Sequence, residues 1–228
     1  MPEENASHGT AIIVGAGGGL GTAIVEELTA EGYPVALLAR DDSRLQNHAA
    51  ELAGSGHTAR AYRADAGDPE NLSAAISQAA DEMGEPDILL YNVADLAPDK
   101  PDELTTAEWN SRFAVNMTGA KVAADAVLPR LRGGHGTLLF TGGGYSLHPS
   151  PKFTALSVGK AALRAYVLAL FEDQRPRGVH AATVTIGGDI GGPGFEPAAI
   201  APRYLELLHQ PPGQWTAEIL HSGATSAP

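Results

Sequence analysis

Apolar residues of this chain fall into short runs, separated by longer stretches in which they recur at helical spacing. Five runs are strongly apolar and stand at 10–14, 34–39, 86–91, 137–141 and 179–186. Their length and their content of leucine and β-branched residues are typical of strands buried on both faces of a sheet. Weaker runs at 58–63 and 215–220 bring the total to about seven. Strands that alternate with helices predict an α/β fold, a single Rossmann-type doubly wound parallel sheet with helices on both faces.

Capping residues mark where several of the helices begin. The pair 68–69 is an N-cap aspartate followed by a proline at the first helical position. Thr105 and Glu108 have the spacing of a capping box, ahead of a long helix that we expect to reach about residue 131. A second long, alanine- and leucine-rich helix is predicted over 151–173.

A glycine-rich turn directly follows the first predicted strand. Five glycines lie within seven residues, at Gly15, Gly17, Gly18, Gly19 and Gly21. The helix that follows places Leu20, Ile24 and Leu28 on one face. Glycines allow a phosphate to approach the main chain closely, and the helix turns its unpaired N–H groups and positive dipole end toward that phosphate. Strand, turn and helix in this order predict a dinucleotide site, with a merely flexible turn as the alternative.

Composition limits the classes of function. The 228 residues carry a formal net charge of −12, which disfavours a nucleic-acid-binding surface, and contain no cysteine, which excludes disulfides and thiolate sites. The acidic start resembles no signal peptide and no run of about 18 apolar residues occurs, so we expect a cytoplasmic protein without a membrane segment. We expect one domain over 10–222, with loose tails at 1–9 and 223–228.

The spacing Gly15-x-x-x-Gly19-x-Gly21 resembles the cofactor turn of the short-chain dehydrogenase/reductase family. Val14 stands where that family usually has threonine. The resemblance covers about residues 10–222. In the family, an acid at the end of the second strand favours NAD by accepting hydrogen bonds from the ribose 2′-hydroxyl. Here Ala39 is followed by Arg40, which suits a 2′-phosphate, so the resemblance implies NADP(H) in preference to NAD(H). The alternative for Arg40 is a solvated pair with a neighbouring aspartate.

The resemblance extends to the ends of later strands. Asp65 stands at the family's acid that meets the adenine amine, and the run 92–94 stands where the family has Asn-Ala-Gly. Asn116 matches the asparagine of the long helix, which in the family opens the helix locally and holds a proton-relay water. The cofactor contacts that the resemblance implies are Gly15, Gly17, Gly18, Gly19, Leu20, Gly21, Arg40, Asp65, Ala66, Asn92, Val93, Ala94, Val115, Lys160, Gly188 and Ile190.

The family's active site is not matched in full. It has Tyr-x-x-x-Lys and a serine about thirteen residues before the tyrosine. Lys160 matches the lysine, but Leu156 stands at the tyrosine and Gly143 at the serine. Hydride arrival at a carbonyl makes an alkoxide, which needs a proton donor and an oxyanion partner, and neither side chain supplies them. Ser157 points about 100° away from Leu156 on a helix.

Few other groups are available for the chemistry. Tyr145, on the loop after the fifth strand, is a relocated acid or a pocket-wall aromatic. With Asn116 and Lys160 it makes up the candidate catalytic set. The histidines show no metal-ligand spacing, so we expect no metal.

Three functions fit these residues. The first is an atypical NADP-dependent oxidoreductase that acts on a small carbonyl- or alcohol-type substrate with a non-standard proton donor. The second is a catalytically silent NADP(H) sensor or scaffold, and the third is a non-redox enzyme on the same fold. Whether the protein is an enzyme stays open at this point, with the oxidoreductase favoured. The long helices build dimers and tetramers in the family, so a homodimer or homotetramer is expected.

Overall fold

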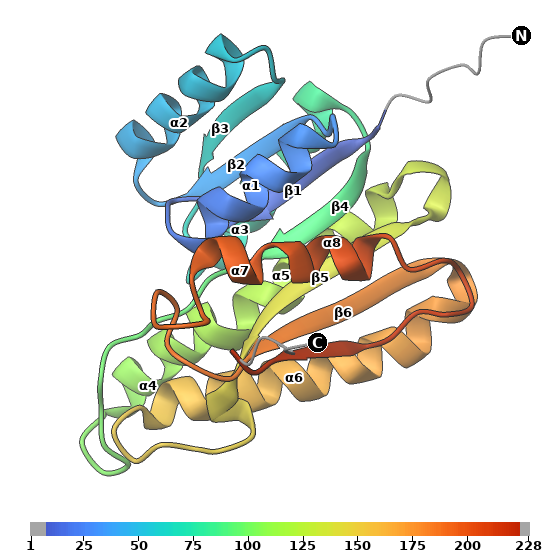
Figure 1. The fold of residues 1–228 in the computed structure, drawn as a ribbon. Helices are drawn as coiled ribbons and strands as arrows, with labels where there is room; N and C mark the ends of the chain where they lie inside the picture. The colour runs from blue at the N-terminus through green and yellow to red at the C-terminus, as the bar shows by residue number, and fades with distance from the viewer. Residues whose placement is uncertain (1–7, 224–228) are drawn as a thin grey trace, which may run out of the picture.

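A computed structural model describes residues 8–223, and its centre is a seven-stranded parallel sheet with the order β3-β2-β1-β4-β5-β6-β7 (Figure 1). Every neighbouring pair of strands runs parallel. The strands are β1 (Thr10–Val14), β2 (Val35–Ala39), β3 (Ala59–Arg63), β4 (Pro86–Tyr91), β5 (Gly136–Gly143), β6 (Val179–Ile186) and β7 (Glu218–His221). The predicted fold class is confirmed.

Helices cover both faces of the sheet and bury a separate apolar layer on each. On one face lie α3 (Pro69–Met83), α5 (Gly119–Val127) and α6 (Thr154–Gln174). On the other lie α1 (Leu20–Ala30), α2 (Asp42–Gly54), α7 (Pro197–Ile200) and α8 (Pro202–Leu208). Successive residues of β1 face opposite layers, with Ile12 in the first and Ile13 in the second. This explains why the strands are apolar throughout rather than alternating.

The first long helix is interrupted where Asn116 lies. The chain runs from α4 (Thr106–Phe113) through a π-helical turn, Ala114–Thr118, into α5. Thr105 and Glu108 form the expected capping box at its start. The wide turn is the local opening that the resemblance implies at this asparagine, and such turns are frequent at functional sites.

The second long helix, α6, begins at Thr154 rather than at residue 151. Its first N–H groups are bound by Asp99, a buried carboxylate from the loop after β4, whose oxygens accept from the backbone N of Thr154 at 2.5 Å and of Ala155 at 3.1 Å. The span 154–177 is long and apolar enough, by length and composition alone, to cross a membrane. It packs instead as a core helix, with Leu163 and Val167 fully buried against the sheet.

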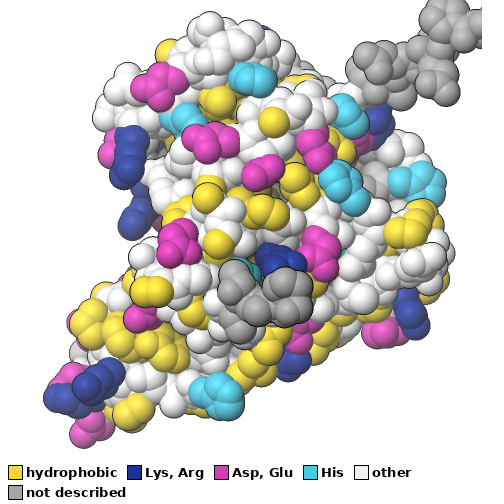
Figure 2. Space-filling model, viewed as in Figure 1, with side chains coloured by type: hydrophobic (Ala, Val, Ile, Leu, Met, Phe, Trp, Pro, Cys, Tyr) yellow, Lys and Arg dark blue, Asp and Glu magenta, His cyan; other side chains and the backbone are white. Residues whose placement is uncertain are grey.

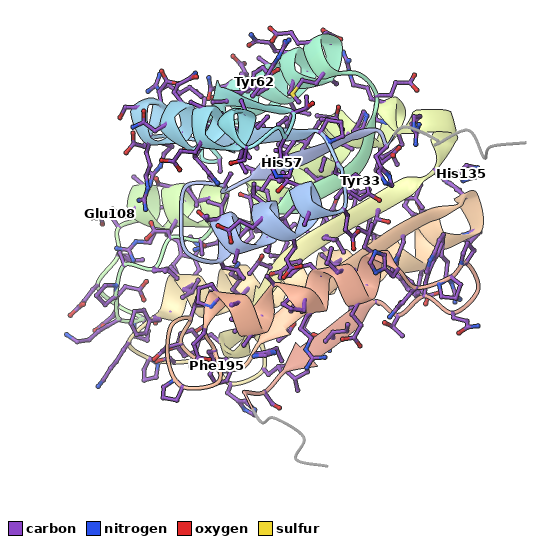
Figure 3. All side chains as sticks on the ribbon, turned by 45° about the horizontal axis from the view of Figure 1, so that its top comes forward. Tyr33, His57, Tyr62, Glu108, His135 and Phe195 are labelled. Carbon is purple, nitrogen blue, oxygen red and sulfur yellow. The ribbon has the colours of Figure 1, made fainter. Side chains whose placement is uncertain are left out.

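The packed chain begins before residue 10. Gly9 is buried and its N–H donates to Oδ2 of Asp87 at 2.5 Å, while the ring of His8 stacks on Tyr33 with centroids 4.1 Å apart (Tyr33 is labelled in Figure 3). The rest of the two expected tails, residues 1–7 and 224–228, lies outside the described residues.

Candidate functional site

A cleft of about 560 Å³ opens at the carboxyl ends of β1, β2 and β4. Because β1 pairs with β2 on one side and β4 on the other, this is the point where the strand order reverses and ligands of such sheets bind. Eleven of the residues expected to contact a cofactor line it: Gly15, Gly17, Gly18, Gly19, Arg40, Asp65, Ala66, Asn92, Val93, Ala94 and Val115. The expected residues outside its lining are Leu20, Gly21, Asn116, Tyr145, Lys160, Gly188 and Ile190.

The glycine turn has the shape of an anion cradle. Gly19 is the N-cap of α1 with φ of 54°, and no side chain caps the helix or fills the space that a Cβ at Gly19 would enter. Gly21 packs so closely that a Cβ there would lie 2.3 Å from the carbonyl oxygen of Gly15. The uncapped amino end of α1 therefore borders a cleft into which a diphosphate fits.

Two arginines stand at the β2 end of the cleft. Arg40, expected from the sequence, follows β2, and Arg44 lies in the first turn of α2. The Arg44 guanidinium reaches over the glycine turn, since a Cβ at Gly18 would lie 2.7 Å from its Nη2. Neither arginine forms an ion pair within residues 8–223, which counts against a solvated pair with Asp41. Basic side chains gather beside the start of α2 in Figure 2.

Sequence reasoning missed Arg44, although a signal was present. It lies four residues after Arg40 on a predicted helix that opens at the end of β2. Asp41 caps that helix by accepting from the Arg44 backbone N at 3.2 Å. This backbone hydrogen bond, the Ser43 hydroxyl and the Arg44 charge lower the pKa of the Asp41 carboxyl, in that order.

Asn92 connects the glycine turn to the core. Its Nδ2 donates to the carbonyl oxygen of Gly15 at 3.2 Å, and its Oδ1 accepts from the hydroxyl of Thr141 at 2.8 Å. The hydroxyl of Tyr204 lies 2.7 Å from the same Thr141 oxygen. Because Thr141 has one proton and gives it to Asn92, Tyr204 is the donor of the second bond. Burial raises the pKa of Tyr204 well above its usual range, so it keeps that proton.

Lys160 is buried beside the ends of β4 and β5. Its Nζ donates to the carbonyl oxygen of Thr141 at 2.7 Å and to that of Val93 at 3.3 Å. No carboxylate among the described residues pairs with it, and burial alone lowers the pKa of the Lys160 ammonium to about 8. An ammonium has three donors, so one remains for a ligand.

Asn116 also retains an unused donor. Its Oδ1 accepts from the backbone N of Asp95 at 2.8 Å, whereas its buried Nδ2 has no hydrogen-bond partner among the described residues. Gly159 on α6 packs against it, since a Cβ there would lie 2.4 Å from the Asn116 Cβ. Asn116 is thereby held beside the helix that carries Lys160.

Leu156, Gly143 and Ser157 offer no free hydroxyl beside Lys160. Leu156, one turn earlier, is 5% exposed, and Gly143 ends β5 with its Cβ position 3.6 Å from Cγ of Lys160. The hydroxyl of Ser157 donates to the carbonyl oxygen of Phe153 at 2.7 Å and accepts from the backbone N of Ser150 at 3.0 Å, so it is already used.

Tyr145, in the short turn after β5, is half-buried and stacks on Phe153 with ring centroids 5.5 Å apart. Its neighbour Ser146 has a buried hydroxyl without a partner among the described residues. Beyond β6, Gly188 packs against the ring of Phe195, labelled in Figure 3, and Ile190 is 48% exposed. These loops border the same edge of the sheet as the cleft.

Comparison with known proteins decides the family. A family model described as short chain dehydrogenase matches residues 9–189. The chain belongs to the short-chain dehydrogenase family. A relative, 2-(S)-hydroxypropyl-CoM dehydrogenase 3 of Xanthobacter autotrophicus, is 30% identical over 176 residues, which are 77% of this chain and 69% of that protein. The protein is therefore an oxidoreductase of the short-chain type.

Solved short-chain dehydrogenases have the same fold. One from Rhodopseudomonas palustris superposes with a TM-score of 0.84 at 26% identity, covering 93% of this chain and 97% of that one. An NADPH-bound short-chain oxidoreductase of Pseudomonas aeruginosa PAO1, which contains an atypical catalytic center, has a TM-score of 0.84 at 22% identity and covers 96% of each chain. At that identity the likeness shows the fold alone.

Proposed function

We propose that this short-chain dehydrogenase binds NADP(H), in preference to NAD(H), and transfers hydride to or from a small carbonyl- or alcohol-type substrate. The observation that carries the proposal is the uncapped glycine turn of α1 next to two arginines that form no ion pair within residues 8–223. Two guanidiniums at the β2 end offer charge-assisted hydrogen bonds to a 2′-phosphate, which NAD lacks.

In this proposal several residues of the site have a defined task. The backbone of Gly17–Leu20 holds the diphosphate, Arg40 and Arg44 hold the 2′-phosphate, and Asp65 meets the adenine. Asn92 keeps the glycine turn in shape through its bond to Gly15. The nicotinamide, when bound, supplies or accepts a hydride and its two electrons. These contacts and the other expected cofactor contacts stay predictions.

The proton for a carbonyl substrate must come from a non-standard donor, because the chain lacks the family's serine and tyrosine. Leu156 and Gly143 leave no hydroxyl at those places. We assign the transfer to the Lys160 ammonium, which has one uncommitted donor and a pKa lowered toward neutrality. Asn116, with its unused amide N–H, is assigned to the polar contact with the substrate or its water. Tyr145 is the second donor candidate.

The same loss of hydroxyls favours a second function, an NADP(H)-reading sensor without chemistry. Both functions need the cofactor, so binding is measured first, by NADPH fluorescence and by thermal shift, with NADH as the comparison. If NADPH neither changes its fluorescence nor raises the Tm, both functions are wrong. If NADPH binds and a panel of aldehydes and ketones is reduced, the oxidoreductase is supported.

Within that panel, two variants assign the proton donor. Lys160→Met should abolish carbonyl reduction, and Tyr145→Phe should leave it within about twofold if the lysine is the donor. The reverse pattern would move the donor to Tyr145. A homodimer or homotetramer and a single domain over 10–222 stay predictions; sedimentation and limited proteolysis test them.

A further inference from the structure

The hydroxyls that the family's serine and tyrosine would supply beside Lys160 are missing, and those of Thr141 and Ser157 are already used. The Thr141 hydroxyl donates to Asn92, and the Ser157 hydroxyl donates to the main chain of its own helix. Leu156 and Gly143 supply none. Hydride addition to a carbonyl leaves a negative oxygen, so carbonyl reduction here depends on the proton that we assign to Lys160; a well-positioned acid contributes about 10²- to 10⁴-fold in rate.

One class of hydride acceptor needs no acid. In an iminium cation the carbon is doubly bonded to a positively charged nitrogen. When that carbon accepts a hydride with its two electrons from the reduced nicotinamide, the C–H bond forms and the π pair becomes the nitrogen lone pair. The products are a neutral amine and oxidised cofactor. No proton is taken up and no negative charge develops, so neither a tyrosine nor an oxyanion partner is required.

The charges along the cleft fit a cation at the end away from the arginines. Asp95 and Leu96 line the β4 end. The Asp95 backbone is fixed by Asn116, and its Oδ1 accepts from the backbone N of Ala97 at 2.9 Å. No cation pairs with the Asp95 carboxylate in the part of the chain that the structure describes. Leu96 is 66% exposed and offers an apolar surface next to this charge.

The Lys160 ammonium is the opposing charge at this end. Two of its donors are bound to main-chain oxygens at the strand ends and the residue is 5% exposed. The carboxylate, by contrast, is open to the cleft, because Asp95 is only half-buried. A cation in the open part of the cleft therefore meets Asp95 before it meets Lys160.

We propose that the site reduces cationic cyclic iminium compounds with an apolar body, held by Asp95 and Leu96, more efficiently than carbonyl compounds of the same shape. This activity rests on the proposed NADP(H) binding and goes beyond the carbonyl reduction assigned to Lys160. It accounts for an intact cofactor cradle next to a site without the family's hydroxyls.

The test compares a matched pair of substrates in the full-length protein with NADPH. The iminium is 1,2-dimethyl-3,4-dihydroisoquinolinium, which is permanently charged and gives a product with a new stereocentre at C1. The ketone is 1-tetralone, of similar size. We expect kcat/KM for the iminium to exceed that for the ketone by at least about 100-fold, and the amine to form with an enantiomeric excess that the protein-free reaction lacks.

Charge variants check the assignment of Asp95. Asp95→Asn keeps the oxygen that accepts from Ala97 and should raise KM for the iminium about tenfold, with the Kd for NADPH unchanged. Asp102→Asn removes the same charge from an exposed residue of the same loop, outside the cleft lining, and should leave KM unchanged. Equal effects of the two variants would show that only net charge matters and would overturn the role of Asp95.

The outcomes separate this proposal from the one it rests on. If NADPH fails to bind, the proposed function is wrong and the iminium activity falls with it. If NADPH binds but the amine forms as a racemate at the protein-free rate, or the ketone is reduced as efficiently as the iminium, the iminium proposal alone is overturned.

Discussion

Gly17→Ala should weaken cofactor binding with little change in the free energy of unfolding. Gly17 has an ordinary negative φ, and an added Cβ would lie 3.6 Å from the Cβ of Ala39, an ordinary van der Waals distance. The free protein therefore has room for alanine, and the free energy of unfolding should change by less than about 0.5 kcal/mol. The methyl group enters the cleft where the diphosphate would meet the main chain.

The substitution should change the free energy of NADPH binding more than it changes the free energy of unfolding. A methyl group forced against a tightly held ligand costs about 1–3 kcal/mol in a packed site, so Kd for NADPH should rise about 5- to 150-fold. Gly21→Ala gives the opposite pattern. Its Cβ would lie 2.3 Å from the Gly15 oxygen, so the turn itself must shift and the free energy of unfolding should fall by about 1–3 kcal/mol or more.

Urea denaturation and NADPH fluorescence titration of both variants measure the two quantities. Gly54→Ala is the control, because Gly54 ends α2 and nothing lies within 4 Å of its Cβ position. This variant should raise the free energy of unfolding by up to about 1 kcal/mol and leave Kd for NADPH unchanged. The reasoning is refuted if Gly17→Ala binds NADPH as tightly as the parent protein, because the cradle would then not contact the diphosphate.

Three further predictions concern charged groups. Arg44→Ala should raise Kd for NADPH about tenfold and leave Kd for NADH unchanged, since one charge-assisted bond to the 2′-phosphate is lost; equal losses would exclude that contact. Asp99→Ala should lower the free energy of unfolding by about 3–5 kcal/mol. It removes the buried carboxylate that binds the first N–H groups of α6 and that pairs with Arg112, whose Nη1 lies 3.2 Å from Oδ2 of Asp99. Glu103→Gln, on an exposed pair of the same loop, should cost less than about 1 kcal/mol. Burial lowers the pKa of Lys160 from 10.5 to about 8, so above pH 8 the unfolded chain binds a proton that the folded chain does not. Relative to Lys160→Met, the parent should therefore gain about 1.5 kcal/mol of unfolding free energy between pH 8 and 9.5, and parallel pH profiles would contradict the buried ammonium.

The sheet was predictable because its strands are apolar on both faces and separated by clear turn residues. The least accurate strand was the last, placed at 215–220 and found at Glu218–His221. It lies at the sheet edge, pairs only with β6 and is partly exposed, so its apolar signal is weak. The start of α6 was missed by three residues because Asp99, which binds its first N–H groups, is 55 residues away from Thr154 in the sequence.

The candidate site also has parts that the sequence predicted and parts that it did not. The glycine turn is local, so its glycines, together with the strand before it and the helix after it, predicted where the cleft lies. Arg44 reaches the cleft only because the capped start of α2 lies beside the turn, which spacing suggests but does not fix. Tyr204 gave no signal, because its bond to Thr141 spans 63 residues and no motif contains both. Contacts between residues far apart in the sequence cannot be predicted from patterns of neighbouring residues.

The hydrogen-bond chain from Tyr204 through Thr141 to Asn92 constrains how this sequence can diverge. The Tyr204 and Thr141 hydroxyls each donate their single proton in a fixed direction, and the Asn92 Oδ1 accepts the last one. A valine at Thr141 would therefore leave the Tyr204 hydroxyl without an acceptor and the Asn92 oxygen without a donor. A simultaneous exchange of Tyr204 and Thr141 for apolar residues removes the phenol and its acceptor together, and leaves only the amide to be satisfied. In homologues these two positions should therefore covary, and a change at either alone should be rare.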